Sequence, residues 1–147
     1  MRSACLPPHP AVAYLFLVRS MLPLATDTTS AAFVASNGEL AWDREDIEPA
    51  LAGIRDSGQA ILGGEVWLIV GPGSWNGLIP RLDGSPPTVW HWETEPRSTS
   101  ESWQHYCERT AEESMNAVRD MPVEQATPPD LIDRLRFNVT YVAEPKT

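Results

Sequence analysis

The sequence contains only two cysteines, Cys5 and Cys107, and they lie far apart in a chain of 147 residues. Two cysteines cannot form the dense disulfide framework of a small secreted domain, so cysteine usage favours a reducing compartment. The chain is long enough to do without such cross-links, because a domain of this size buries roughly 68–70% of its unfolded surface. We therefore expect a single cytoplasmic domain.

Basic residues are also scarce: 11 Lys and Arg stand against 20 Asp and Glu, which gives a net charge of −9. Such a charge opposes binding to nucleic acid or to an anionic membrane surface. It suits a soluble acidic protein, or one whose partner is a basic protein. We expect a protein partner, with no nucleic acid and no membrane.

Long hydrophobic runs are missing as well. The segment 11–18 is apolar but has only eight residues before Arg19, which is too short to cross a bilayer. A proline cluster at 6–10 lies where the apolar part of a signal peptide would begin. We predict a poorly ordered extension over 1–23, or a true start at Met21 or later, with export as the less favoured alternative, and a domain over 24–144.

No catalytic signature is present. Ser74 lies between glycines in the loop 71–77, but the spacing of a hydrolase elbow and the lysine of a phosphate loop are both missing. His91 has no second histidine nearby and no cysteine at ligand spacing, and His105 and Cys107, two residues apart, would face different sides of a helix. We predict no catalytic residue, no cofactor and no metal, and hence no enzyme.

What the sequence does contain is a strongly apolar run, residues 59–70, rich in β-branched and aromatic residues that favour a buried strand. Gly63 and Gly64 interrupt it, which indicates a bulge or a close backbone approach. Glu65 is the only charge in the run. It lies either at an edge or bulge that turns it to water, or at a bulge that aims it at a partner.

Two helices are predicted. For the first, Asp43 is a suitable N-cap and Gly58 a suitable end, but Pro49 requires either a kink or a tight turn over 43–47 with the helix starting near Glu48. Its apolar face comprises Ile47, Ala50, Leu51 and Ile54.

The second helix follows a capping box, Ser98-Thr-Ser-Glu101, and ends before Pro122. Arg109 can pair with Glu113 one turn later. The predicted inward stripe comprises Trp103, Tyr106, Cys107, Thr110, Ala111, Ser114, Ala117, Val118 and Met121. The predicted outer face comprises Glu101, Gln104, Glu108, Glu112, Glu113 and Asn116.

Further strands are predicted at 31–35, 88–95 and 136–143, with a short return strand at 78–82. The segment 122–129 reads as a loop, and one helical turn follows it. The fold class is therefore α+β: one domain with an antiparallel sheet of about four to five strands packed against two helices.

Several short strings resemble the immunity protein 40 family of bacterial polymorphic toxin systems. They are Trp42-Asp-Arg-Glu-Asp46, Ala60-Ile-Leu-Gly-Gly-Glu-Val-Trp67, Trp90-His-Trp92 and Glu101-Ser-Trp-Gln-His-Tyr106. The similarity covers roughly residues 40–121, and the chain departs from the pattern in the loop 71–87 and in its amino-terminal segment. The resemblance implies a small cytoplasmic α+β protein that binds and neutralises a cognate toxin, with no catalytic residues.

A basic toxin such as a nuclease would suit the acidic composition. We name Glu45, Asp46 and Glu48, before the first helix, and Glu93 and Glu95, on the Trp-rich strand, as candidates for one negative binding surface. Two further candidates are Glu65, if the bulge turns it outward, and Trp75, which either anchors a partner or folds back onto the sheet. The alternative functions are a small enzyme of unknown substrate or a general protein-interaction module, and the sequence leaves the oligomeric state open.

Overall fold

The computed structural model describes residues 32–146, so the predicted extension 1–23 and the adjoining segment 24–31 lie outside the described part. The elements in chain order are β1 (Phe33–Val34), β2 (Leu40–Trp42), α3 (Ile47–Asp56), β3 (Gln59–Gly71), β4 (Ser74–Asn76), β5 (His91–Glu93), α4 (Trp103–Asp120), α5 (Val123–Ala126), the 3-10 helix η2 (Pro129–Arg134) and β6 (Leu135–Ala143). The predicted α+β class is confirmed.

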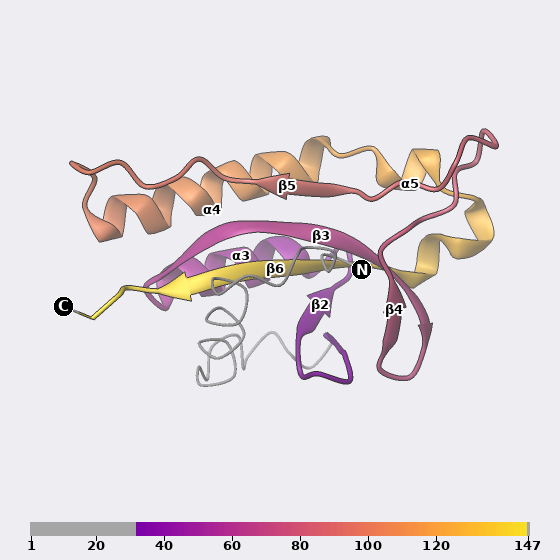
Figure 1. Ribbon diagram of the computed structural model, residues 1–147, viewed down its shortest axis with the longest axis horizontal. Coiled ribbons are helices and arrows are strands. Elements are labelled where there is room, and N and C mark those ends of the chain that lie inside the picture. The colour runs from indigo at the N-terminus through magenta and orange to yellow at the C-terminus, as the bar shows by residue number, and fades with distance from the viewer. Residues whose placement is uncertain (1–31, 147) are drawn as a thin grey trace.

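Strand β3 is the centre of the sheet, as its unusually apolar sequence leads one to expect (Figure 1). The order is β1-β2-β6-β3-β4, and β5 pairs with β3 beside β4, with all neighbours antiparallel. Six strands take part where about four to five were predicted. Two strands were not predicted, β2 at Leu40–Trp42 and β4 at Ser74–Asn76. The return strand predicted at 78–82 is wrong, because this segment makes a single bridge, between Ile79 and Thr88.

Helix α3 and the later turns of α4 enclose the main core on one face of this sheet, whereas the first turns of α4 pack on Ala60, Leu62 and Val142. The predicted apolar face of α3 is fully buried, and so are Trp42, Val66 and Phe137 of the strands. On α4, six of the nine predicted stripe residues are buried: Tyr106, Cys107, Thr110, Ala111, Ser114 and Val118. The spacing of the apolar residues thus predicted the buried face of both helices correctly.

The start of α3 follows the second of the two predicted alternatives. Residues 43–46 form a tight turn in which the Asp43 carboxylate accepts the Asp46 N–H at 2.9 Å, and the helix begins at Ile47. Asp43 therefore caps this turn, and the position before the helix belongs to Asp46, whose side chain makes no capping bond. Pro49 falls in the first helical turn, where a backbone N–H has no partner within the helix, so no kink is needed.

A bulge interrupts β3 where the glycine pair predicted one. The register against β6 slips between Ile61 and Gly63, so that Leu62 is the extra residue. The displaced backbone of Ile61 is satisfied by side chains: its N–H donates to Thr110 Oγ1 at 3.0 Å, and its carbonyl accepts from Thr94 Oγ1 at 2.7 Å.

The two glycines serve different purposes at this bulge. Gly63 has a φ of +154°, a conformation that side chains disfavour. Gly64 allows close approach, because a Cβ there would overlap the Trp92 ring and the Asn138 carbonyl oxygen. Both predicted reasons for the glycine pair are confirmed, one at each residue.

The sheet curls, which brings its two ends together and encloses a smaller core on the face away from α3. The backbone N–H of Ser36, after β1, donates to the carbonyl of Gly73 in the β3–β4 turn at 3.0 Å. Inside the curl, Trp67 stacks on Trp75 with ring centroids 3.9 Å apart and meets Phe33 edge to face. Trp75 thus folds back onto the sheet, which is the second of its two predicted alternatives.

Candidate functional site

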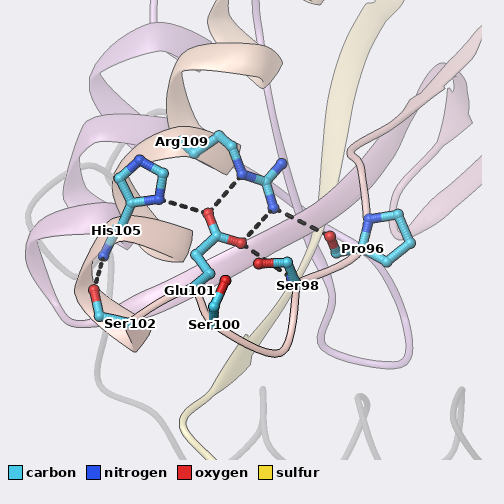
Figure 2. A pocket seen from close by; sticks show the side chains of 7 residues that line it. All are labelled: Pro96, Ser98, Ser100, Glu101, Ser102, His105 and Arg109. Atoms are coloured by element: carbon cyan, nitrogen blue, oxygen red, sulfur yellow. Dashed lines mark hydrogen bonds and ion pairs between the residues drawn. The ribbon is translucent and has the colours of Figure 1, made fainter.

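A polar depression lies where the segment between β5 and α4, residues 94–102, meets the start of α4 (Figure 2). Helix α4 begins one turn later than the predicted capping box. Its N-cap is Ser102, whose Oγ accepts the His105 N–H at 3.1 Å. The Ser98–Glu101 pair instead closes a separate turn, in which the Ser98 N–H donates to the Glu101 carboxylate at 3.3 Å.

Four side chains at four-residue spacing form an ion-pair cluster along this end of α4: Glu101, His105, Arg109 and Glu113. Arg109 binds Glu101 through two nitrogens, Nε at 2.7 Å and Nη2 at 3.0 Å, and reaches Glu113 through Nη1 at 2.7 Å. The predicted Arg109–Glu113 pair is confirmed. The predicted outward position of Glu101 is wrong, because only 7% of its side chain is exposed.

The cluster fixes the charge of its central carboxylate. The hydrogen bonds from Arg109 hold the pKa of Glu101 at about 2, well below its ordinary value of 4.5, with help from the Ser98 N–H and from His105. The same contact with Glu101 raises the pKa of Arg109. Glu101 is therefore ionised at neutral pH and can only accept hydrogen bonds.

An ionised Glu101 in turn orients His105. Its Nδ1 lies 2.6 Å from Glu101 Oε2, so Nδ1 carries a proton and the other ring nitrogen is left for solvent or a partner. The depression has a volume of about 470 Å³ and is lined by Pro96, Ser98, Ser100, Glu101, Ser102, His105 and Arg109. Its lining can form hydrogen bonds through the exposed serines and the imidazole of His105.

Arg109 and Glu113 also fasten the chain that leaves β5. The Glu95 N–H donates to Glu113 Oε1 at 3.0 Å, and Arg109 Nη2 donates to the carbonyls of Glu95 and Pro96 at 3.2 and 3.3 Å. The cluster was not predicted as a unit. Its signal was present in the sequence, since residues 101, 105, 109 and 113 recur once per helical turn.

Three of the predicted partner-binding acids lie on or beside the sheet. Glu65 is half-buried and sits between Asn138 of β6 and His91 of β5, so it occupies the middle of the sheet and not an edge. Glu93 is exposed on β5, and its side chain lies on the face opposite to the buried Trp92. Glu95 is exposed just beyond β5.

The other three acids lie at the start of α3, on the helical side of the sheet. Glu45 is exposed and Asp46 is half-buried. Glu48 pairs with Arg119 of α4, Nη2 to Oε1 at 2.7 Å, and this hydrogen bond lowers the pKa of Glu48. Because the sheet separates them from Glu65 and Glu93, the acids form two groups on opposite faces and not the one surface that we predicted.

Within residues 32–146, no group of three or more His, Cys, Asp or Glu side chains is placed to hold a metal ion, and no helix has the length and hydropathy needed to cross a membrane. Cys107 is buried beside Tyr106, and burial raises the pKa of its thiol to about 11, as expected of an unreactive core cysteine. Comparison of the chain with protein-family models, with curated proteins and with solved structures found no match.

Proposed function

We propose that this protein is an immunity protein that neutralises a basic cognate toxin by binding to it. The observation that carries the proposal is that most of the arginines in the described domain form ion pairs with acids of the same domain. Five arginines are engaged in ion pairs with acids of the same domain: Arg44, Arg55, Arg81, Arg109 and Arg119.

This internal pairing leaves the surplus acids at the surface. Exposed carboxylates that take part in no ion pair within residues 32–146 include Glu45, Glu93, Glu95, Glu108, Glu112, Asp120, Asp130 and Asp133. A surface of this kind attracts a basic protein and accelerates its encounter. The resemblance to the immunity protein 40 family supports the same function, and a nuclease is a toxin class that carries the complementary charge.

The test is to express the product of the gene immediately upstream in bacterial cells, with and without this protein, and to follow growth. We expect growth to stop when the upstream product is made alone and to recover when both are made. The purified pair should form a complex in titration calorimetry. An unrelated protein of equal size and net charge is the control, since mere charge neutralisation would let it rescue growth too. Arrest despite expression of this protein, with no complex, would reject the proposal.

A further inference from the structure

Among residues 32–146, the one strand that pairs with β5 is β3, so β5 forms an edge of the described sheet (Figure 1). Two backbone hydrogen bonds establish which of its residues face β3. The Val66 N–H donates to the Trp90 carbonyl at 2.8 Å, and the Thr94 N–H donates to the Leu62 carbonyl at 3.1 Å. In an antiparallel pair, bonded residues alternate with unbonded ones, so Trp92, midway between them, also bonds to β3.

The backbone N–H and C=O groups of the intervening residues, His91 and Glu93, therefore point outward from the sheet. Glu95, two residues further along, also has its backbone groups on the outer side, but there they are bonded. Glu113 accepts its N–H and Arg109 donates to its carbonyl. Within residues 32–146, no strand or side chain makes the equivalent bonds at His91 and Glu93. In the part of the chain that the structure describes, the sheet edge is thus closed at residue 95 and open over 91–93.

The side chains along this open edge define what it can accept. Trp92 points into the core, where its indole bonds to Ser114, so His91 and Glu93 project from the opposite face. Val89 has the same parity and is 43% exposed. The row along this face therefore runs from an apolar residue, through an imidazole, to a carboxylate at Glu93.

From the open backbone groups and this side-chain row, we infer that the β5 edge over His91–Glu93 accepts an extended segment of a basic protein, which adds to the sheet as a further strand. Backbone pairing supplies the affinity in this mode of recognition, and alternate side chains supply the specificity. A Lys or Arg on the added strand pairs with Glu93, and an apolar residue meets Val89. The Arg109–Glu113 cover at Glu95 limits the added strand to about three to five residues.

The inference rests on the proposed function in one respect: the natural segment belongs to the toxin. A direct test uses a defined probe, the blocked pentapeptide acetyl-Lys-Thr-Lys-Thr-Val-amide, in which an antiparallel added strand places the first Lys opposite Glu93 and the Val opposite Val89. It is titrated into the full-length protein and followed by amide NMR. The shifts should concentrate at His91 and Glu93, and the exchange of these two amide protons, fast in the free protein, should slow. The same peptide with alternate amides N-methylated cannot pair and should not bind.

Two substitutions at Glu93 distinguish the contribution of its backbone N–H to peptide binding from that of its carboxylate. Glu93→Pro removes an N–H that makes no bond within the described fold, and proline is tolerated on edge strands in such positions. It should weaken peptide binding about tenfold or more, because it removes a donor and obstructs the added strand. Glu93→Thr keeps the N–H and removes the charge, and should weaken binding only a few-fold. Thermal melts of both variants establish that they are folded.

Equal binding of the peptide to the wild type and to folded Glu93→Pro overturns the inference, and so does a peptide that leaves the amides of residues 91 and 93 unchanged. The upstream gene product provides the second arm. If it is neutralised and Glu93→Pro protects as well as the wild type, the edge inference fails and the immunity function stands. If the peptide pairs at 91–93 but the upstream product is not neutralised, the immunity function fails and the edge site stands.

Discussion

The indole N–H of Trp92 donates to the hydroxyl of Ser114 at 3.0 Å, inside the core. This bond joins the edge strand β5 to the middle of α4. It also fixes which face of β5 turns outward, since a strand that buries Trp92 must project its neighbours on the other side. The outward position of His91 and Glu93 thus depends on the buried hydrogen bond between Trp92 and Ser114, which lie 22 residues apart in the sequence.

Removing the hydroxyl should leave the indole N–H buried without a partner. We expect Ser114→Ala to lower the free energy of unfolding by about 1–3 kcal/mol, the typical cost of such a group. Denaturant titration followed by tryptophan fluorescence measures this change. Asn116→Ala, on the exposed side of the same helix, is the matched control and should change stability by less than about 0.5 kcal/mol. A Ser114→Ala protein as stable as the control would mean that the bond contributes nothing.

Substitution by alanine should change the stability of the fold in opposite directions at two glycines, Gly64 and Gly53. At Gly64, a Cβ would overlap Trp92 and the Asn138 carbonyl, so Gly64→Ala should destabilise the fold by about 3 kcal/mol or more. Gly53 lies within α3, and a Cβ there would meet nothing within 4 Å. Gly53→Ala should therefore stabilise the protein by about 0.5–1 kcal/mol through helix propensity. Thermal and denaturant unfolding measure both changes, and destabilisation at Gly53 or tolerance at Gly64 would contradict this reading of the backbone.

Much of the fold was predictable, because local patterns agreed with the final environment. The segment 136–143 was predicted as a strand from its alternating pattern, and it forms β6, whose Phe137, Val139 and Tyr141 lie in the core. The apolar period of the two helices predicted what they bury. The glycine pair marked the bulge at the correct place, since few other features put two glycines inside an apolar run.

The predictions failed where a long-range contact decides the structure. Glu101 looked like an outer helical acid, but Arg109 and the turn at Ser98 bury it. Arg44 gave no signal at all, yet it reaches from the turn before α3 to Glu124 at 2.7 Å and to the Val118 carbonyl at the end of α4. The Arg44 contacts do not follow from spacing, because the partners meet only after the chain folds, whereas Glu101 and Arg109 lie at helical spacing and their pairing was missed.

The Glu101–Arg109 pair predicts how stability responds to acid. The folded pKa of Glu101, about 2, lies below its ordinary value of 4.5, so the unfolded chain binds a proton first as the pH falls. The stability that this carboxylate contributes is complete above pH 4.5 and is lost as the pH falls from 4.5 towards 2. Glu101→Gln should therefore be less stable than the wild type at pH 7, and the difference in melting temperature should shrink below pH 4.5. A difference that stays constant across this range would exclude Glu101 as the source, and Asn116→Ala, which changes no titrating group, is the control.

The division of the acids into two faces makes the proposed encounter with a toxin testable by charge reversal. Glu93→Lys with Glu95→Lys alters the β5 side, and Glu45→Lys with Asp46→Lys alters the helical side by the same amount of charge. If the toxin docks at the β5 edge, the first pair should slow association several-fold at low salt, whereas the second pair should slow it less, through net charge alone.

Raising the salt to physiological ionic strength should slow the wild type and reduce the gap between the two double variants, because screening then acts beyond about 8 Å. The variant at Glu93 and Glu95 should unfold at nearly the wild-type denaturant concentration, because exposed charges contribute little to stability. Asp46 is half-buried before α3, so a denaturant titration must establish that the second variant is folded. Stopped-flow association of the purified pair across ionic strength measures all three proteins. Equal slowing by the two reversals would show that only the net charge matters. A larger effect of the helical pair would move the docking surface to the start of α3, away from the β5 edge.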